Sequence, residues 1–299
     1  MFQVPGNFAA NTAAWYSDVG REWIERLPLM VEVLCEQWGL VIDGSPMHGG
    51  LSVAIPVQRG GELCILKVGL KDETTQEEAL ALAVWNGNGA VRLLAEEPSM
   101  GGMLLERLDS RRSLNDVGLE EALSIAGSLL CRLSIPAPLG VPLLRETGVR
   151  LAEELPERWE RCNCPMSRSL MERAAALSVD LAPAAKTLLV NYDLIYEDVL
   201  AGEREPWLVV DPKVIAGDPE YGVAQLLWTR LEEMQERGGL KHHFNVLVSV
   251  AELDPELTRL WTLVRCVDYW LWGVSVGLTE DPKRCRVICD FLENSLSVF

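Results

Sequence analysis

The sequence predicts an α+β protein of two lobes, in which a small N-terminal lobe combines a β-sheet with helices and a large C-terminal lobe is mainly helical. Two observations predict this division. Short runs rich in β-branched residues are concentrated between Leu51 and Leu105, whereas long stretches with helical periodicity dominate after Leu108. The change of pattern gives an N-terminal lobe of residues 1–107 and a C-terminal lobe of residues 108–299.

The N-terminal lobe is expected to begin with helices and to continue as a hairpin. From Thr12 to Trp38 apolar residues recur at helical spacing, and Pro28 marks a predicted break between two helices. Leu51–Val57 and Leu63–Val68 are predicted strands, joined by a turn that contains Gly60 and Gly61. The lobe is completed by a helix at Thr74–Trp85 and by two further strands at Val91–Leu94 and Met103–Leu105.

The C-terminal lobe contains one predicted pair of strands within a helical background. Thr187–Val190 and Trp207–Val210 form this pair, and everything after Tyr221 is predicted to be helical. The helical stretches before the strands are Leu119–Leu133, Val149–Trp159 and Ser167–Ala182.

The charge of the chain limits its partners. The 299 residues include 27 basic and 44 acidic side chains, which gives a formal net charge of −17. Such a surface repels nucleic acid and anionic membranes and attracts cations, so a cationic small molecule is the expected partner. The N-terminus lacks the basic and apolar regions of a signal peptide, and no apolar run reaches the roughly 20 residues of a membrane span. A cytoplasmic protein is expected, and no pattern specifies its oligomeric state.

Three acidic residues follow or separate the two strands of the C-terminal lobe. Asp193 and Asp198 have the Asp-x4-Asn spacing of kinase-like enzymes, with Asp in place of Asn, and Asp211 directly follows an apolar strand. Phosphoryl transfer needs a carboxylate that accepts the proton of the attacking hydroxyl and oxygen ligands that hold Mg²⁺. A single acid after a strand is usually only solvated, but the three together predict a phosphoryl-transfer site.

Residues in the N-terminal lobe fit the same chemistry. Lys67 lies inside an apolar strand, where its charge needs a partner, and Glu78 lies early in the next helix, within reach of that strand. The alternative for Lys67 is an exposed strand edge. Further candidate nucleotide-binding residues are the turn Gly49, Gly50 and Ser52, whose backbone N–H groups suit phosphate, and the junction Glu106–Leu108, whose backbone suits adenine.

The sequence resembles the aminoglycoside and hydroxyurea antibiotic kinases, and in particular the streptomycin 6-phosphotransferases. The resemblance extends over nearly the whole chain, from the first helices to about Leu278. The segments that carry it are Glu78–Leu94, Met103–Leu108, Arg204–Pro219 and Leu226–Arg230.

This resemblance implies a protein-kinase-like fold and transfer of the γ-phosphoryl group of ATP (or GTP), with Mg²⁺, to a hydroxyl of a cationic antibiotic. A streptomycin-like aminoglycoside is the first expected substrate, and a basic tuberactinomycin peptide is an alternative. The resemblance also assigns roles to the candidate residues: Asp193 as the catalytic base, Asp198 and Asp211 as metal ligands, and Lys67 with Glu78 as the phosphate-binding pair.

The catalytic segment departs from the family pattern His-Gly-Asp-Leu-His-x-x-Asn. Here Asn191 and Tyr192 replace His and Gly, and Asp198 replaces the final Asn. In the family's Gly-Asp-Pro-x-x-Asp motif, Gly222 replaces the second acid. These changes keep open a different class of function, a pseudokinase-like protein that binds without transferring a phosphoryl group.

Several remaining features have ordinary structural interpretations. The eight cysteines are expected to be reduced thiols, since neither close pair completes a zinc site. His242 and His243 face different directions on a helix, so a solvated pair is favoured over a metal site. Trp261, Trp270 and Trp272 are expected in the core. Glu232, Glu233 and Glu236 are expected to form an exposed acidic face of a helix just after the Asp218 region. Asp218 and these three glutamates are candidate contacts for a cationic drug.

Overall fold

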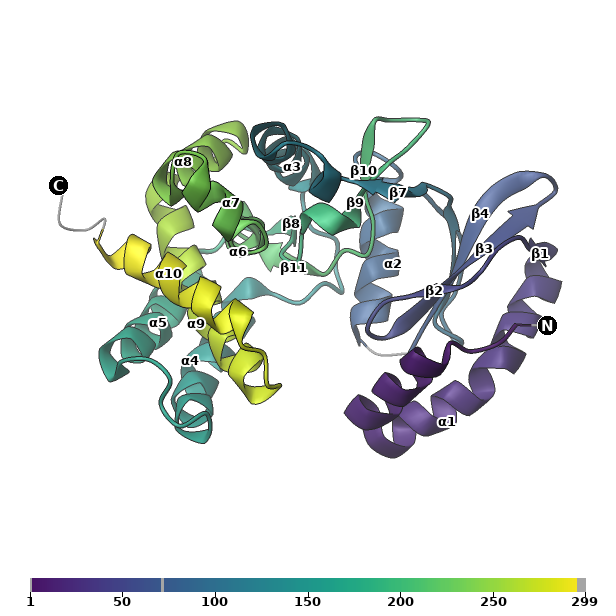
Figure 1. The fold of residues 1–299 in the computed structure, drawn as a ribbon, viewed down its shortest axis with the longest axis horizontal. Helices are drawn as coiled ribbons and strands as arrows, with labels where there is room; N and C mark the ends of the chain where they lie inside the picture. Colours follow the sequence, from purple (N-terminus) through teal and green to yellow (C-terminus); the bar gives the residue numbers. More distant parts are fainter. Residues whose placement is uncertain (1, 71–72, 295–299) are drawn as a thin grey trace. The chain divides into compact units, whose positions relative to one another are not determined.

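The computed structural model describes residues 2–70 and 73–294, and its helices and antiparallel sheets confirm the α+β class (Figure 1). The chain forms two compact units. The first, here called the sheet unit, comprises Met1–Asp109 and Gly202–Pro206. The second, here called the helical unit, comprises Ser110–Ala201 and Trp207–Phe299. The segment Gly202–Pro206 therefore belongs to the sheet unit, although the residues on both sides of it belong to the helical unit.

The sheet unit is built on an antiparallel sheet with the strand order β1-β3-β4-β6-β5, and β2 pairs with β3. The predicted hairpin is confirmed: β3 pairs with β4, and Gly60 and Gly61 occupy the turn with positive φ. The elements are α1 (Gly6–Trp38), β1 (Leu40–Ile42), β2 (Met47–His48), β3 (Ser52–Arg59), β4 (Glu62–Gly69), α2 (Glu73–Trp85), β5 (Leu93–Glu97) and β6 (Gly102–Glu106).

Alternation along the strands places α1 and α2 on opposite faces of this sheet (Figure 1). Ile55 on β3 and Leu66 on β4 are register partners, and both are buried in the cluster that contains Leu27 and Leu34 of α1. The next residue of β4, Lys67, faces the other way and reaches α2. The sheet therefore separates an apolar layer under α1 from a face that carries a buried charge.

The predicted helix break at Pro28 is wrong. The helix α1 continues through Pro28, and its irregular residue is Ser17, with φ 50° and ψ −127°. Proline removes one N–H from the helical ladder. The helix persists there because Leu27, Met30 and Val31 are all buried against the sheet, which holds both sides of the proline in place.

The helical unit contains two small antiparallel sheets, of order β10-β9-β7 and β11-β8. The predicted strands exist, but their predicted pairing is wrong: β8 pairs with β11, and β10 pairs with β9. The elements are β7 (Asp109–Ser113), α3 (Leu119–Leu133), α4 (Leu144–Arg161), α5 (Arg168–Leu181), β8 (Leu188–Asn191), β9 (Val199–Ala201), β10 (Trp207–Val209), β11 (Val214–Gly217), α6 (Ala224–Trp228), α7 (Leu231–Glu236), α8 (Leu240–Val250), α9 (Pro255–Ser275) and α10 (Glu280–Asn294).

The helix α9 forms much of the core of the helical unit. Trp261 and Trp270 are buried as predicted, but Trp272 is 45% exposed. Its ring stacks on Tyr269 at 5.1 Å between ring centroids. Within residues 2–70 and 73–294, every helix is too short or too polar to span a bilayer.

Candidate active site

The sheet unit holds a buried ion pair between Lys67 on β4 and Glu78 on α2. Lys67 Nζ lies 2.7 Å from Oε1 and 2.6 Å from Oε2 of Glu78. Strand alternation turns Lys67 towards α2, and both side chains are almost fully buried. A buried ammonium group needs such a partner. The structure thus brings together the two residues that the sequence analysis joined.

The glycine turn forms a tight connection between β2 and β3. The N–H of Gly49 donates to the carbonyl oxygen of Ser52 at 3.0 Å, so this N–H is engaged within the turn itself. Gly50 and Ser52 complete the turn, and Ser52 begins β3. The Gly49 N–H, one of the groups predicted to bind phosphate, therefore already donates a hydrogen bond to the Ser52 carbonyl oxygen.

Glu106 ends β6, and its carboxylate is occupied by an arginine from a distant segment. Arg204 Nη2 lies 2.6 Å from Glu106 Oε1, and the same guanidinium donates to the carbonyl oxygens of Gly87 and Ala90. Hydrogen bonding to Glu106 raises the pKa of Arg204 above its ordinary value, and this outweighs partial burial. Leu108 follows two residues later and is half-buried. These contacts fix the end of the strand from which the candidate adenine-binding segment begins.

In the helical unit, Asp193 follows β8 and is held by two donors. Lys213 Nζ lies 2.5 Å from Asp193 Oδ2, and the Gln225 amide donates to Asp193 Oδ1. The backbone N–H of Asp193 donates to the side chain of Asn191 at 3.1 Å. Asn191 therefore caps the turn that carries the acid, and the two donors orient its carboxylate.

Lys213 retains its positive charge because of the acids around it. Burial by itself lowers the pKa of Lys213, but the attraction of Asp193, and to a lesser extent of Tyr192 and Asp211, leaves the pKa above its ordinary value. Asp193 thus faces a permanently charged partner at neutral pH.

Asp198 and Asp211 are brought to the same end of the β9–β10 hairpin. The N–H of Val210 donates to the carbonyl oxygen of Asp198 at 2.8 Å, and Asp211 is the next residue. Asp211 is exposed and has a positive φ of 50°. Two carboxylate residues so placed provide the oxygen ligands that Mg²⁺ prefers.

Three of the four acids predicted to meet a cationic drug have partners within the fold. Asp218 is buried and accepts hydrogen bonds from the Lys186 N–H and from Trp261 Nε1, both at 2.9 Å, so its carboxylate is engaged within the fold. Glu232 pairs with Arg284 at 2.7 Å, and Glu233 pairs with Arg230 and Arg237. Glu236 ends α7.

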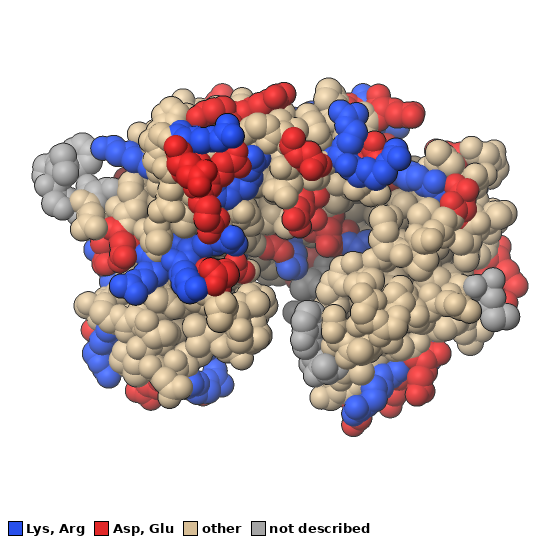
Figure 2. Space-filling model, viewed as in Figure 1, with Lys and Arg blue, Asp and Glu red and all other residues tan. Residues whose placement is uncertain are grey.

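Figure 2 shows that acidic and basic side chains lie side by side on the face that carries α7 and α10. The glutamates Glu232 and Glu233 contribute to this mixed surface, and their charges are compensated by arginines. A purely acidic face, as the sequence suggested for α7, is not formed there.

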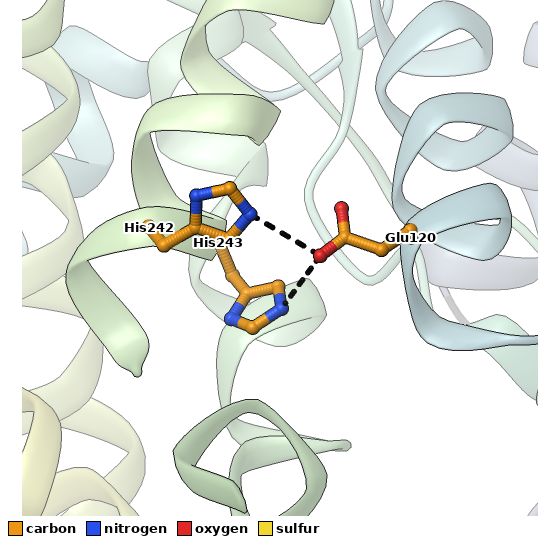
Figure 3. A group of neighbouring side chains, drawn as sticks. All are labelled: Glu120, His242 and His243. Atoms are coloured by element: carbon orange, nitrogen blue, oxygen red, sulfur yellow. Dashed lines mark hydrogen bonds and ion pairs between the residues drawn. The ribbon is translucent and has the colours of Figure 1, made fainter. Parts of the chain in front are cut away.

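The expectation that His242 and His243 form a solvated pair is wrong for His243. His243 is fully buried, and both imidazoles reach Glu120, as Figure 3 shows. Adjacent residues of a helix point in different directions, but α3 packs against α8 closely enough that one carboxylate meets both rings.

Comparison with known proteins identifies the family. The family model described as "Aminoglycoside/hydroxyurea antibiotic resistance kinase" matches residues 37–277, which is most of the chain. The chain belongs to this family. It is therefore a small-molecule phosphotransferase.

Two curated relatives are similar over almost their whole length. A streptomycin 6-kinase from Streptomyces glaucescens is 34% identical over 284 residues, which cover 93% of this chain and 92% of the relative. A hydroxyurea phosphotransferase from Kitasatospora aureofaciens is 36% identical over 297 residues, which cover 97% of this chain and 86% of the relative.

Solved structures share the fold at lower identity. The aminoglycoside phosphotransferase APH(4)-Ia superposes with a TM-score of 0.62 at 17% identity, covering 90% of this chain and 99% of that structure. The choline kinase LicA from Streptococcus pneumoniae gives a TM-score of 0.57 at 13% identity, covering 89% and 99%. These likenesses confirm the two-lobed, protein-kinase-like architecture of the antibiotic resistance kinases.

Tyr192, which stands where the antibiotic resistance kinases have glycine, is accommodated by a buried arginine. Tyr192 is not among the positive-φ residues of the described chain, so this position does not require glycine here. The guanidinium of Arg265 lies 5.1 Å from the Tyr192 ring centroid and donates to the Tyr192 carbonyl oxygen at 3.2 Å. Burial by itself lowers the pKa of Arg265, but the attraction of Tyr221, Asp268 and Asp193 outweighs this and leaves the pKa above its ordinary value. The arginine therefore stays charged.

Gly222, at the position where the resemblance places a second acid, packs directly on β8. A Cβ atom added at this position would lie 2.8 Å from the carbonyl oxygen of Asn191 and 3.0 Å from Leu130 Cδ1. The backbone approach therefore excludes any side chain here. An acidic side chain at this position would collide with the backbone of Asn191.

Three residues near Asp193 were given no role from the sequence: Lys213, Gln225 and Arg265. Arg265 had a detectable signal, since it is a single charge within the apolar run Leu263–Val267 and so needs buried partners. Lys213 lies two residues after Asp211 in a segment that resembles the family, but its spacing alone does not indicate which acid it contacts. No sequence pattern around Gln225 indicates that its side chain contacts Asp193.

Proposed function

We propose that this chain transfers the γ-phosphoryl group of ATP or GTP to a hydroxyl of a cationic antibiotic, with a streptomycin-like aminoglycoside as the first acceptor to test. The similarity to streptomycin 6-kinase over 93% of the chain supports the acceptor. The observation that carries the phosphoryl-transfer step is the buried Lys67–Glu78 pair, because a positioned lysine of this kind suits the nucleotide phosphates.

In this proposal, residues 1–107 bind the nucleotide and residues 108–299 supply the catalytic segment and the acceptor site. Lys67 contacts the phosphates, and Glu78 positions Lys67. The Gly49–Ser52 turn and the Glu106–Leu108 segment provide backbone groups for the phosphates and the base. Asp193 accepts the proton of the acceptor hydroxyl as it attacks the γ-phosphorus, while Lys213 and Gln225 orient its carboxylate.

Asp198 and Asp211 are the proposed Mg²⁺ ligands. Their shared position at one end of the β9–β10 hairpin and their carboxylate oxygens fit this ion. When bound, Mg²⁺ neutralises charge on the nucleotide phosphates. Asp198 replaces a neutral Asn ligand of the family, so the two carboxylates together place more negative charge beside the nucleotide than the family pattern does.

Hydroxyurea is a second candidate acceptor. The 36% identical relative is a hydroxyurea phosphotransferase, and the compensation of Glu232 and Glu233 by arginines weakens the case for a strongly cationic substrate. Hydroxyurea is uncharged, so ionic strength discriminates between the two acceptors. Screening raises the KM of a polycationic acceptor with added salt and leaves that of hydroxyurea nearly constant.

The deciding experiment is nucleotide consumption by the purified protein with ATP or GTP and Mg²⁺. The acceptor panel contains streptomycin, a tuberactinomycin peptide, hydroxyurea and no acceptor, and the Asp193→Asn variant is the matched control. Acceptor-dependent turnover that is lost in the variant supports the proposal. Nucleotide binding without turnover on any acceptor would instead identify a pseudokinase-like binding protein.

A further inference from the structure

Two imidazoles and one carboxylate meet where α3 packs against α8 in the helical unit (Figure 3). The Nε2 atoms of His242 and His243 each lie 3.2 Å from Oε1 of Glu120. The candidate ligand atoms of the three residues all lie within 4.8 Å of one another. The cluster shares no residue with the proposed phosphoryl-transfer site.

The hydrogen bonding of His243 fixes the role of each ring nitrogen. Nδ1 lies 2.9 Å from the carbonyl oxygen of Gly239, and because a carbonyl only accepts, Nδ1 carries a proton. In the neutral ring, Nε2 then has an unprotonated lone pair. This atom is buried and has no hydrogen-bond partner in the described part of the chain. A buried lone pair that faces a carboxylate oxygen is unfavourable unless a positive centre lies between them.

At His243 a metal ion fits this geometry better than a proton, whereas His242 Nε2 is within hydrogen-bonding geometry of Glu120 Oε1. The ring plane fixes the direction of a proton on His243 Nε2, and the 3.2 Å contact to Glu120 Oε1 lacks the alignment of a hydrogen bond. A metal ion lies off the line between these two atoms. With bonds of about 2.1 Å in a tetrahedral zinc site, two ligand atoms are about 3.4 Å apart, close to the observed spacing. The donation from Nδ1 to a backbone carbonyl is typical of histidines that bind metals.

We propose that Glu120, His242 and His243 bind one divalent transition-metal ion, with Zn²⁺ as the first candidate, and that this ion ties α3 to α8. Two imidazole nitrogens and one carboxylate oxygen suit Zn²⁺ and its neighbours, whereas Mg²⁺ prefers oxygen ligands alone. Glu120 and His242 are 58% and 52% exposed, so the ion enters from solvent and water completes its coordination.

The test is calorimetric titration of chelator-treated protein with zinc chloride alone. We expect one zinc ion per chain. The exposed His242 is the residue to change, since His242→Gln leaves the core intact. It should weaken zinc binding by roughly 100-fold or more, because losing even an outer-shell partner costs about 10–100-fold. His48→Gln is the matched control: His48 is an exposed histidine of the sheet unit, and its loss should leave zinc affinity unchanged.

Thermal unfolding gives a second readout. At free zinc about 100 times Kd, the Tm of the wild type and of His48→Gln should rise by roughly 5 °C, and that of His242→Gln should not. The proposal would be overturned if the wild type bound zinc only with a Kd above about 100 μM or not at all. Equal binding by the wild type and His242→Gln would also overturn it, because this result would place the zinc at another site, such as the cysteine thiols or the Asp198–Asp211 pair.

Discussion

Each unit of the molecule contains a pair of one lysine and one carboxylate, and the two pairs differ chiefly in their exposure to water. Lys67–Glu78 in the sheet unit has side chains that are 8% and 7% exposed, at 2.6 Å. Lys213–Asp193 in the helical unit has side chains that are 50% and 24% exposed, at 2.5 Å. An ammonium–carboxylate contact of nearly the same length therefore occurs once buried and once accessible to water.

The difference in exposure predicts how easily each pair separates: the buried Lys67–Glu78 pair should stay together, and the more exposed Lys213–Asp193 pair should separate easily. A buried pair is held because either partner alone would be an uncompensated charge, and breaking such a pair costs about 3–5 kcal/mol. An exposed pair contributes about 0–1 kcal/mol, so its partners separate easily. In the proposed function, Asp193 has to be reached by an acceptor hydroxyl while Lys213 orients it, whereas Lys67 stays where Glu78 holds it.

The largest effect is expected for Asp193→Asn. Without a base for the acceptor hydroxyl, kcat should fall by roughly 10²–10⁴-fold, while the affinity for nucleotide changes little. Steady-state kinetics and calorimetric ATP binding measure the two quantities. A folded variant that loses both equally would place Asp193 at the nucleotide and not at the acceptor.

Lys67→Met should have the next largest effect, and it acts on stability as well as on binding. The buried Glu78 carboxylate loses its ammonium partner, so the free energy of unfolding in urea should drop by about 3–5 kcal/mol. The double variant Lys67→Met with Glu78→Leu should recover most of this loss but not nucleotide binding. If the single variant unfolds no more easily than Lys213→Gln, the contrast between the two pairs is wrong.

Lys213→Gln should leave stability within about 1 kcal/mol and lower kcat by about tenfold, because Asp193 loses a positioning partner. The pKa of Lys213 is raised in the folded protein, so its stabilising charge is fully present below the unfolded pKa of about 10.4 and is lost only as pH rises through the still higher folded value. The ratio of wild-type to variant kcat should therefore be constant between about pH 6 and 9. Lys213→Arg is the control, expected to retain most activity.

The smallest effect is expected at Asp198. With Asp211 nearby, its carboxylate should repel nucleotide when metal is absent, and Mg²⁺ should relieve that repulsion. ATP affinity, measured with Mg²⁺ and with chelator, should thus depend on the metal several-fold more in the wild type than in Asp198→Asn. Equal dependence in both proteins would remove Asp198 from the metal site.

The sequence predicted best what short segments determine. The helix at Leu119–Leu133 was placed at both ends because its apolar periodicity is continuous, and the Lys67–Glu78 contact joins residues only eleven apart. Strand pairing in the helical unit was wrong because β9 and β11 were not predicted, so β8 and β10 had only each other as possible partners.

The contacts that orient Asp193 could not be predicted in the same way. Lys213 and Gln225 are 20 and 32 residues away in the chain, and Arg265 contacts Tyr192 from 73 residues away. Such pairs depend on how β8, β11 and α9 are brought together, which no local pattern encodes. His243 was misjudged for the same reason, since its burial comes from α3, more than one hundred residues earlier.

The position of Arg204 also restricts how this gene can recombine with those of its relatives. A crossover after residue 109 would inherit the sheet unit from one parent but residues 202–206 from the other, although both belong to one compact unit. Glu106, Gly87 and Ala90, which contact Arg204 here, would then face a 202–206 segment from the other parent. Functional chimeras between family members are therefore expected where the exchanged fragment carries positions 106 and 204 from the same parent.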